Sequence, residues 1–206
     1  MAGYNLLEPL ADLNYLKKQG INGPIWALIA LDSHNYEIPK VSEEGVQATR
    51  ENIIDTILKA ELEDGGWALS GETADPDMTA MAIQALAPYY SGNAQVEVAV
   101  DKALDCLSAL QNADGGYTSW GTTNSESCAQ VLTALTALKI DPLTDVRFIK
   151  NGNSVMDALL GFYVEGGGFS HTPDGEVNGI ATEQGYCALA SYARMQAGKT
   201  SLYDMS

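Results

Sequence analysis

The stretch Glu61-Leu62-Glu63-Asp64-Gly65-Gly66-Trp67 decides the fold, because the chain repeats its last three residues at a regular interval. The units Gly115-Gly116-Tyr117 and Gly167-Gly168-Phe169 have the same glycine–glycine–aromatic pattern, at successive spacings of 50 and 52 residues. A fixed period of about 20 to 50 residues is typical of architectures in which similar supersecondary units stack on one another. The chain is therefore predicted to be an array of such units.

Each of these loops lies between two stretches with helical periodicity. Before the first loop, the segment from Glu51 to Leu62 has Ile53, Ile54, Ile57 and Leu58 on one face, which predicts an amphipathic helix. After the loops, residues 78–86 and 128–138 are small or apolar on nearly every side, and a helix of that kind is buried on every side. We therefore expect the first helix of each pair to lie outside and the second, alanine-rich helix to lie inside.

The pattern predicts an all-α fold of about four helical hairpins, with few strand signals. A weaker copy of the inner helix covers Asn22 to Leu31 at the front of the chain. Residues 1–206 are expected to form a single domain, because about 100–200 residues are usual for one. The predicted helices cover residues 5–17, 23–34, 47–61, 77–90, 95–110, 125–138, 152–163 and 180–197.

A polar residue stands at the predicted start of every inner helix. Asp77, Glu126 and Glu183 align in one frame, and Asn22 has the same place in the weaker first copy. Because inner helices should all begin at one end of the fold, these four residues are predicted to form a polar rim around the mouth of a central cavity. The alternative is structural, since an acidic residue also stabilises the first turn of a helix.

Composition excludes several classes of partner and site. The chain has 11 basic and 27 acidic residues and a net charge of −16, which repels phosphate, so no nucleic-acid partner is expected. Its longest apolar run, Ile25 to Leu31, is far shorter than the roughly 20 residues of a membrane span, and no signal peptide opens the chain. The three cysteines and two histidines have no metal-site spacing, so neither a metal nor a cofactor is expected.

The loop units and their preceding helices resemble the glycine–aromatic repeats of terpenoid cyclases and protein prenyltransferase β subunits. The resemblance rests on Glu61 to Trp67 and on Leu110 to Tyr117, extends from about residue 45 to 197, and is fainter before that. It implies an α/α toroid, in which inner helices ring a cavity and outer helices surround them. Complete toroids of this kind have six hairpins, so the chain is expected to be a partial ring, the C-terminal part of a longer protein.

The resemblance also implies a test for the prenyltransferase zinc site, whose ligands are Asp, Cys and His. Asp114 matches the first ligand, but Gly116 stands at the cysteine position and Glu183 at the histidine position. Since a catalytic zinc ion is usually held by about three protein ligands, a zinc prenyltransferase is not expected.

Class II terpenoid cyclases carry an Asp-x-Asp-Asp motif whose middle acid protonates an alkene. Asp75-Pro76-Asp77 matches it except for the final acid, where Met78 stands. The resemblance therefore implies Asp77 as a candidate catalytic acid, helped by Asp75. An ordinary helix start accounts for the same residues, because an N-cap carboxylate followed by proline is a common opening of a helix.

Several further residues are candidate ligand contacts, because they belong to the polar rim or could line an aromatic wall of the cavity. The aromatic members of the glycine–aromatic units have a second interpretation, which is packing at the junction of neighbouring repeats. The candidate ligand-binding residues are Asn22, Trp26, Trp67, Tyr117, Trp120, Glu126, Phe169, His171, Glu183 and Tyr186.

Three functions remain open at this point. The first is a non-catalytic module of a bacterial secreted or surface protein, binding a small apolar molecule, a corrinoid (by analogy with the toroid of animal vitamin B12 carriers) or other modules of its parent protein. The second is a cyclase-like enzyme, and the third is a structural spacer whose cavity is filled by side chains. An open arc would also expose apolar flanks at its first and last helices, so self-association is expected.

Overall fold

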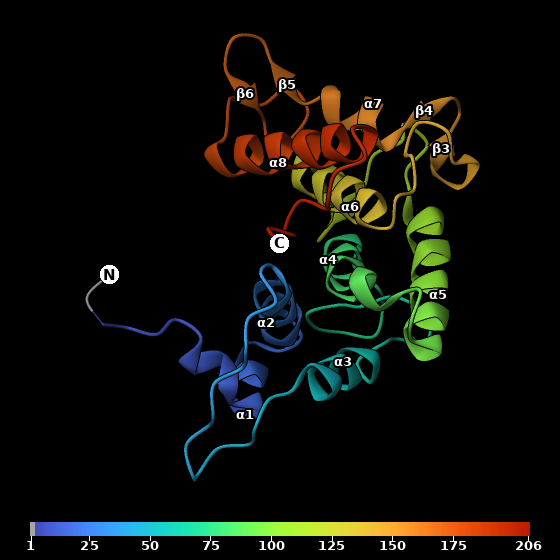
Figure 1. Ribbon diagram of the computed structural model, residues 1–206. Coiled ribbons are helices and arrows are strands. Elements are labelled where there is room, and N and C mark those ends of the chain that lie inside the picture. The colour runs from blue at the N-terminus through green and yellow to red at the C-terminus, as the bar shows by residue number, and fades with distance from the viewer. Residues whose placement is uncertain (1–2) are drawn as a thin grey trace.

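The computed structural model describes residues 3–206, and its helices form an arc of two layers (Figure 1). The inner layer consists of α2 (Asn22–Asp32), α4 (Pro76–Leu86), α6 (Ser125–Ala137) and α8 (Gly179–Gln196), and each contacts the next in chain order. The outer layer contains α3 (Arg50–Leu58), α5 (Ala94–Leu110) and α7 (Val155–Leu160), which pack on α2, α4 and α6. The predicted α/α toroid of about four hairpins, with inner and outer helices, is confirmed.

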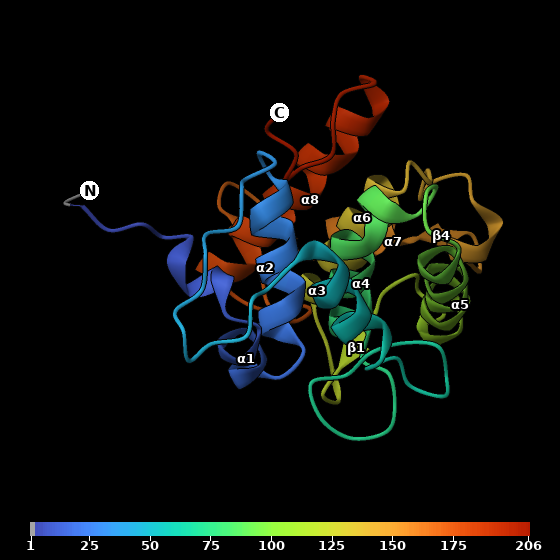
Figure 2. The same ribbon diagram turned by 60° about the horizontal axis from the view of Figure 1, so that its bottom comes forward.

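Burial follows the predicted division between the layers. In α6, every residue from Cys128 to Thr136 is buried, whereas α5 exposes Asp101, Lys102 and Asp105 on one face. The four inner helices lie side by side in the second view as well (Figure 2). Buried small side chains on these helices, such as Ala82 and Ala134, leave room for neighbouring helix backbones to lie close together.

Three of the predicted helices are at least six residues shorter than their sequence pattern indicates, and the one predicted over 47–61 is α3, which covers only Arg50–Leu58. The segment predicted as one helix over 5–17 consists of the 3₁₀ turn η1 (Glu8–Ala11), the single helical turn α1 (Leu13–Leu16) and the 3₁₀ turn η2 (Lys17–Gln19). Asp12 interrupts it, because its backbone is extended and forms a bridge with Gln47. The helix predicted over 152–163 is the short α7, which begins at a capping box formed by Ser154 and Asp157.

Short hairpins join the helices, and the sequence pattern does not predict them. Two-residue strands pair antiparallel in three places: β1 (Thr118–Ser119) with β2 (Thr122–Thr123), β3 (Ile149–Lys150) with β4 (Asn153–Ser154), and β5 (Tyr163–Val164) with β6 (Gly168–Phe169). Such strands are too short to show an alternating pattern in the sequence. One further 3₁₀ turn, η3 (Ala87–Tyr89), follows α4, and another, η4 (Val146–Phe148), precedes β3.

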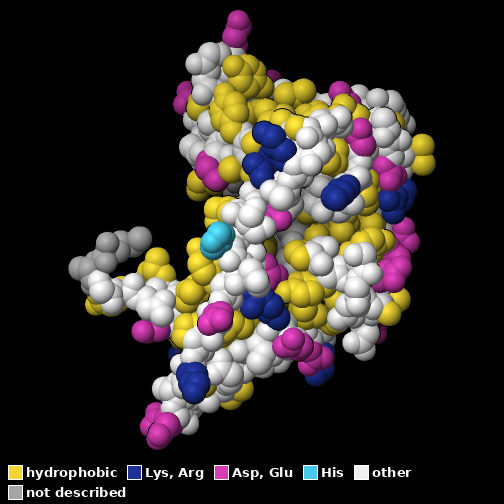
Figure 3. Space-filling model, in the orientation of Figure 1, with side chains coloured by type: hydrophobic (Ala, Val, Ile, Leu, Met, Phe, Trp, Pro, Cys, Tyr) yellow, Lys and Arg dark blue, Asp and Glu magenta, His cyan; other side chains and the backbone are white. Residues whose placement is uncertain are grey.

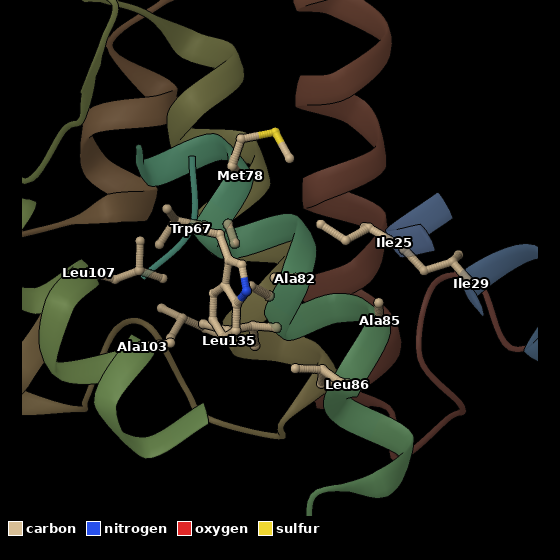
Figure 4. Packing of buried hydrophobic residues seen from close by; sticks show 14 of the residues in the cluster. Ile25, Ile29, Trp67, Met78, Ala82, Ala85, Leu86, Ala103, Leu107 and Leu135 are labelled. Atoms are coloured by element: carbon tan, nitrogen blue, oxygen red, sulfur yellow. The ribbon is translucent and has the colours of Figure 1, made fainter. Parts of the chain in front are cut away.

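The aromatic rings of the glycine–aromatic units are buried. Figure 4 shows the Trp67 ring among side chains of inner and outer helices, such as Ala82 and Ala103. Trp67 and Tyr117 are completely buried, and each donates a hydrogen bond to the outer helix before it, from Trp67 Nε1 to Ile57 O at 2.7 Å and from the Tyr117 hydroxyl to Leu107 O at 3.1 Å. In both units the acceptor precedes the ring by ten residues. Phe169 occupies the same place in the third unit, and its ring is buried and has no hydrogen-bond donor.

A second repeated contact fixes the frame in which the inner helices align. Thr79 Oγ1 accepts a hydrogen bond from Trp67 N, and Thr182 Oγ1 accepts one from Phe169 N, both at 3.0 Å. This equivalence makes Ile180 the counterpart of Asp77, so the alignment that placed Glu183 there is wrong by three residues. Glu183 lies inside α8, five residues beyond its N-cap Asn178, and does not belong to a rim with Asp77 and Glu126. The segment from Phe169 to the N-cap Asn178 is two residues longer than the equivalent segment from Tyr117 to the N-cap Asn124, so the repeats do not share one loop length.

The segment after α8 returns across the open side of the arc to the first inner helix. Met205 N donates a hydrogen bond to Ser33 O at 2.7 Å, and His34 Nδ1 lies 3.3 Å from Met205 O. The Tyr203 ring packs edge-to-face against Trp26 with a centroid distance of 5.8 Å. The first and last inner helices are thus connected through this tail (residues 197–206), whose end lies within the arc in Figure 1.

Candidate functional site

The concave face of the arc contains a cavity of about 370 Å³, which we call the inner cavity. All four inner helices and the tail contribute to its wall, so it exists only because the repeats curve around a common centre. Figure 3 shows the open side of the arc, where the surface is hollowed between the N-terminal segment and the region of α8. The lining residues are Trp26, Met81, Ala129, Gln130, Thr133, Glu183, Gln184, Cys187 and Tyr203.

One side of the inner cavity combines aromatic rings, sulfur atoms and a carboxylate. Trp26 on α2 is 37% exposed and has the Tyr203 ring against it. Glu183 on α8 accepts a hydrogen bond of 3.3 Å from the Cys187 thiol one turn later. The pKa of Tyr203 is raised, chiefly by burial, and the nearby Cys187 and Glu183 add to the rise. The carboxylate and the two rings therefore face the same small space.

A chain of glutamine amides reaches the same wall through Gln130 and Gln184. Gln84 Nε2 donates to Gln130 Oε1 at 2.9 Å, and Gln130 Nε2 donates to Gln184 Oε1 at 3.1 Å. The chain thus crosses from α4 through α6 to α8, and it leaves the Oε1 atom of Gln84 buried without a hydrogen-bond partner among residues 3–206. An amide network of this kind holds the inner helices in register and offers polar atoms to the concave face.

A larger cavity of about 990 Å³ lies at the other end of the inner helices, where they lead into the tail. Gln84, Thr136 and Ser191 line it, together with Asp32 and Tyr90. It shares Thr133 and Tyr203 with the inner cavity, so Tyr203 stands between the two spaces.

A cluster of carboxylates surrounds the first turns of α4 and α6. Asp75 is the N-cap of α4, and its Oδ1 accepts hydrogen bonds from the backbone N–H groups of Asp77 at 3.0 Å and Met78 at 3.1 Å. Its other oxygen accepts a very short hydrogen bond from the Ser119 hydroxyl. The helix-start interpretation of Asp75 is therefore correct, and both oxygens of its carboxylate are already engaged.

Asp77 has a different environment from Asp75. Its Oδ1 atom is buried and has no hydrogen-bond partner among the described residues, and the hydroxyl of Ser127 is in the same condition. Burial raises the pKa of Asp77 to about 6, the carboxylates of Asp75 and Glu126 add to the rise, and the nearby hydroxyls of Ser127 and Ser119 oppose it. Asp77 is thus a carboxyl group that holds its proton at mildly acidic pH.

Glu126 and His171 are in hydrogen-bond contact beside this cluster. His171 Nδ1 lies 2.9 Å from Glu126 Oε2, and the loop that carries the histidine is fixed to α6 because Ser125 N donates to His171 O at 3.1 Å. The sequence placed these two residues in one candidate site, and the structure brings them into contact. Asn22, by contrast, is the half-buried first residue of α2.

The other aromatic candidates do not line the inner cavity. Trp67, Tyr117 and Phe169 are fully buried between the helix layers, so the packing interpretation of these three rings is correct. Trp120 is 78% exposed at the turn between β1 and β2, with a positive φ of 50°. Tyr186 is half-exposed on α8 and packs edge-to-face against Phe169 with a centroid distance of 5.6 Å.

Sequence reasoning identified two of the nine residues of the cavity wall, Trp26 and Glu183, and missed the other seven. Tyr203 lies in the tail, where no repeat or motif draws attention to it. Gln130 and Gln184 are polar residues within largely apolar helices, and that contrast is the signal that could have identified them. Met81, Thr133 and Cys187 carry no such signal.

The residues present do not fit the zinc site that prenyltransferases use. Asp114, which matches the first zinc ligand, accepts a hydrogen bond of 2.9 Å from Gly116 N and closes its own loop, as Asp64 does in the preceding repeat. Gly116 has no side chain to offer, and Glu183 lies on the wall of the inner cavity. Within residues 3–206, no group of three His, Cys, Asp or Glu side chains is arranged to hold a metal ion. Over the same residues, no helix combines the length and apolarity of a membrane span.

Comparison with known proteins agrees with this architecture. Residues 7–206 match the family described as the prenyltransferase alpha-alpha toroid domain, and the chain belongs to that family. Among solved structures, it is similar to Candida albicans protein geranylgeranyltransferase-I complexed with GGPP, with 17% sequence identity and a TM-score of 0.56. That match covers 86% of this chain and 50% of the other, so this chain spans half the length of the enzyme chain it resembles in fold. No curated protein matches the sequence.

Proposed function

We propose that this chain is a non-catalytic ligand-binding module, part of a longer toroid in a bacterial secreted or cell-surface protein, and that the inner cavity is its binding site. The observation that carries the proposal is the composition of the cavity wall, to which four helices and the tail each bring a side chain. A structural spacer would need no such cavity.

The wall has the mixture that small-molecule sites use. Trp26, Met81 and Tyr203 supply apolar surface, while Gln184 and Thr133 supply a few polar atoms. Pockets of about 300–1,000 Å³ with this balance accommodate small organic ligands, and the inner cavity is at the lower end of that range. The ligand is therefore expected to be small, or to place only one end inside the arc.

Equilibrium dialysis against cobalamins and a panel of lipids and small amphiphiles tests the proposal. A bound ligand is expected to change the fluorescence of Trp26, and Ala129→Leu is expected to abolish binding by filling the cavity from α6. Ala94→Leu, which makes the same change at an exposed residue of the outer helix α5, is the matched control. Absence of binding across the whole panel would overturn the binding function and leave protein interaction as the role of the fold.

A second candidate function rests on Asp77. A buried carboxyl with a raised pKa and a partnerless oxygen has the properties of a general acid, as in a class II terpenoid cyclase. If the chain is such an enzyme, it converts squalene or geranylgeranyl diphosphate, and Asp77→Asn abolishes the turnover. Wild-type protein that leaves both substrates unchanged rules this candidate out.

A further inference from the structure

The wall of the inner cavity carries one negatively charged side chain and no positively charged one among the described residues. Glu183 is the only charged residue among the nine described residues that line it, and no lysine or arginine is present in that wall. The chain as a whole carries a net charge of −16, which adds to the negative potential of the site. A ligand that enters this cavity therefore meets one carboxylate and no compensating positive charge.

The groups around Glu183 suit an organic cation. Trp26 and Tyr203 offer ring surfaces, and a cation over the face of a tryptophan is attracted by about 0.5–2 kcal/mol. Met81 and Cys187 add polarisable sulfur atoms to the same wall. A calcium or magnesium ion needs about six oxygen ligands, which this wall does not offer. An alkylammonium ion instead packs its hydrocarbon groups on aromatic and thioether surface and needs one counter-charge.

We infer that the inner cavity binds a small organic ammonium ion, with its charged nitrogen between Glu183 and the ring of Trp26. This inference rests on the proposed function and names the class of ligand for the same site. The cavity volume of about 370 Å³ is ample for choline or tetramethylammonium, and a larger molecule can insert its ammonium group. The amides of Gln130 and Gln184 in the same wall then offer hydrogen bonds to the polar end of the ligand.

Choline and 3,3-dimethylbutan-1-ol test this inference directly, because the alcohol has the same shape as choline with a neutral carbon in place of nitrogen. Binding is measured by isothermal titration calorimetry and by Trp26 fluorescence at constant ionic strength. Choline is expected to bind at least about tenfold more tightly than the alcohol, which corresponds to about 1.4 kcal/mol.

Two substitutions localise the effect. Glu183→Gln keeps the shape of the side chain and the acceptor for the Cys187 thiol, and it is expected to weaken choline binding by about tenfold while leaving the alcohol unaffected. Glu176→Gln removes the same charge from an exposed loop residue and is expected to change neither ligand. If both substitutions weaken choline equally, the effect comes from net charge and the site assignment is wrong.

The outcomes separate this inference from the proposed function. If the alcohol binds as well as choline, and Ala129→Leu abolishes both, the cavity is a binding site and the ammonium inference is overturned. If neither compound binds, the ammonium inference is again overturned, and the dialysis panel alone decides whether the module binds a ligand of another class.

Discussion

The polar atoms of Trp67 and Tyr117 show why aromatic residues with a hydrogen-bond donor follow the glycine pairs in the first two units. Each ring fills the junction between layers, and its donor reaches a carbonyl group of the outer helix before it. A buried aromatic ring thus supplies both packing and one directional bond. The backbone of Gly115, at φ 87°, approaches so closely that a Cβ atom there would lie 2.5 Å from Ser154 O, which accounts for a glycine in the loop.

Removal of the Tyr117 hydroxyl isolates the contribution of that bond. Tyr117→Phe is expected to lower the free energy of unfolding by about 1 kcal/mol, because the ring still packs but its bond to Leu107 O is lost. Urea denaturation measures the difference. Tyr186→Phe is the control, since its ring is half-exposed on α8, and it is expected to have almost no effect. Equal stabilities of Tyr117→Phe and wild type would contradict the assignment.

Asp77 should make the protein less stable as the pH rises. The pKa of this carboxyl is raised to about 6 in the folded protein, from its ordinary 3.8. Between these values the folded state binds more protons than the unfolded state, so this group's contribution to stability falls as pH rises through the window. Asp77→Asn is therefore expected to unfold at higher urea concentration than wild type at pH 7, by about 2 kcal/mol, and to match it near pH 4.

The difference between wild type and Asp77→Asn across this range isolates Asp77 from the other carboxylates. Asp145 and Asp157 have lowered pKa values because of hydrogen bonds from Arg147 and Ser154. Their contribution to the free energy of unfolding is lost at lower pH, and equally in both proteins. Glu63→Gln, an exposed loop residue, is expected to leave the pH profile unchanged. A wild-type profile that coincides with that of Asp77→Asn would mean that Asp77 is solvated.

At the scale of the element, α8 contains two glycines with opposite surroundings. A Cβ atom on Gly185 would lie 2.6–2.8 Å from atoms of the Phe169 ring, whereas one on Gly179 would meet nothing within 4 Å. Gly185→Ala is therefore expected to destabilise the protein by about 1–3 kcal/mol, although alanine favours helix. Gly179→Ala is expected to be neutral or slightly stabilising. Urea denaturation of the pair decides the point, and a stabilising Gly185→Ala would show that the ring moves aside.

The inner helices were predictable from the sequence because a helical segment that is apolar on every side must be covered on every side. The segment 5–17 was not, because the extended Asp12 makes a long-range bridge to Gln47 that no local pattern contains. The misplaced Glu183 has a similar origin. The repeat contact that sets the frame joins Thr182 to Phe169 across a loop of a different length, and only the fold reveals that length.

At the scale of the whole molecule, only two of the nine residues of the candidate site were predictable from the sequence. Trp26 and Glu183 were identified as ligand contacts, and they lie on the same cavity wall. Their partners come from other elements: Tyr203 from the tail and the glutamine chain from α6 and α8. A cavity of this kind depends on how four helices curve around one centre, and the sequence of each repeat specifies only its own hairpin.

The flanks of the arc are expected to self-associate. On α8, Ile180 is 65% exposed and Tyr186 is half-exposed, while Tyr4 and Leu6 are exposed near the other flank. Light scattering is expected to give a mass that rises with protein concentration, and Ile180→Ser with Tyr186→Ser should reduce it. Glu165→Gln, at an exposed loop position, is the control. A monomer at every concentration would contradict the expectation.

The tail determines how firmly the two ends of the arc are held together. Tyr203 and Met205 connect it to Trp26 and Ser33 on the far side of the opening. Deletion of residues 201–206 is therefore expected to lower the melting temperature by about 3–8 °C, because a loss of about 1 kcal/mol shifts a domain of this size by about 2–4 °C. It should also shift tryptophan emission to longer wavelength. Trp67 is fully buried and Trp120 is already exposed, so the shift would report Trp26.

Tyr203→Phe is the control for the tail deletion, because it keeps the ring and should preserve both the melting temperature and the emission wavelength. Unchanged melting and emission after the deletion would show that α2 and α8 hold their positions without the tail.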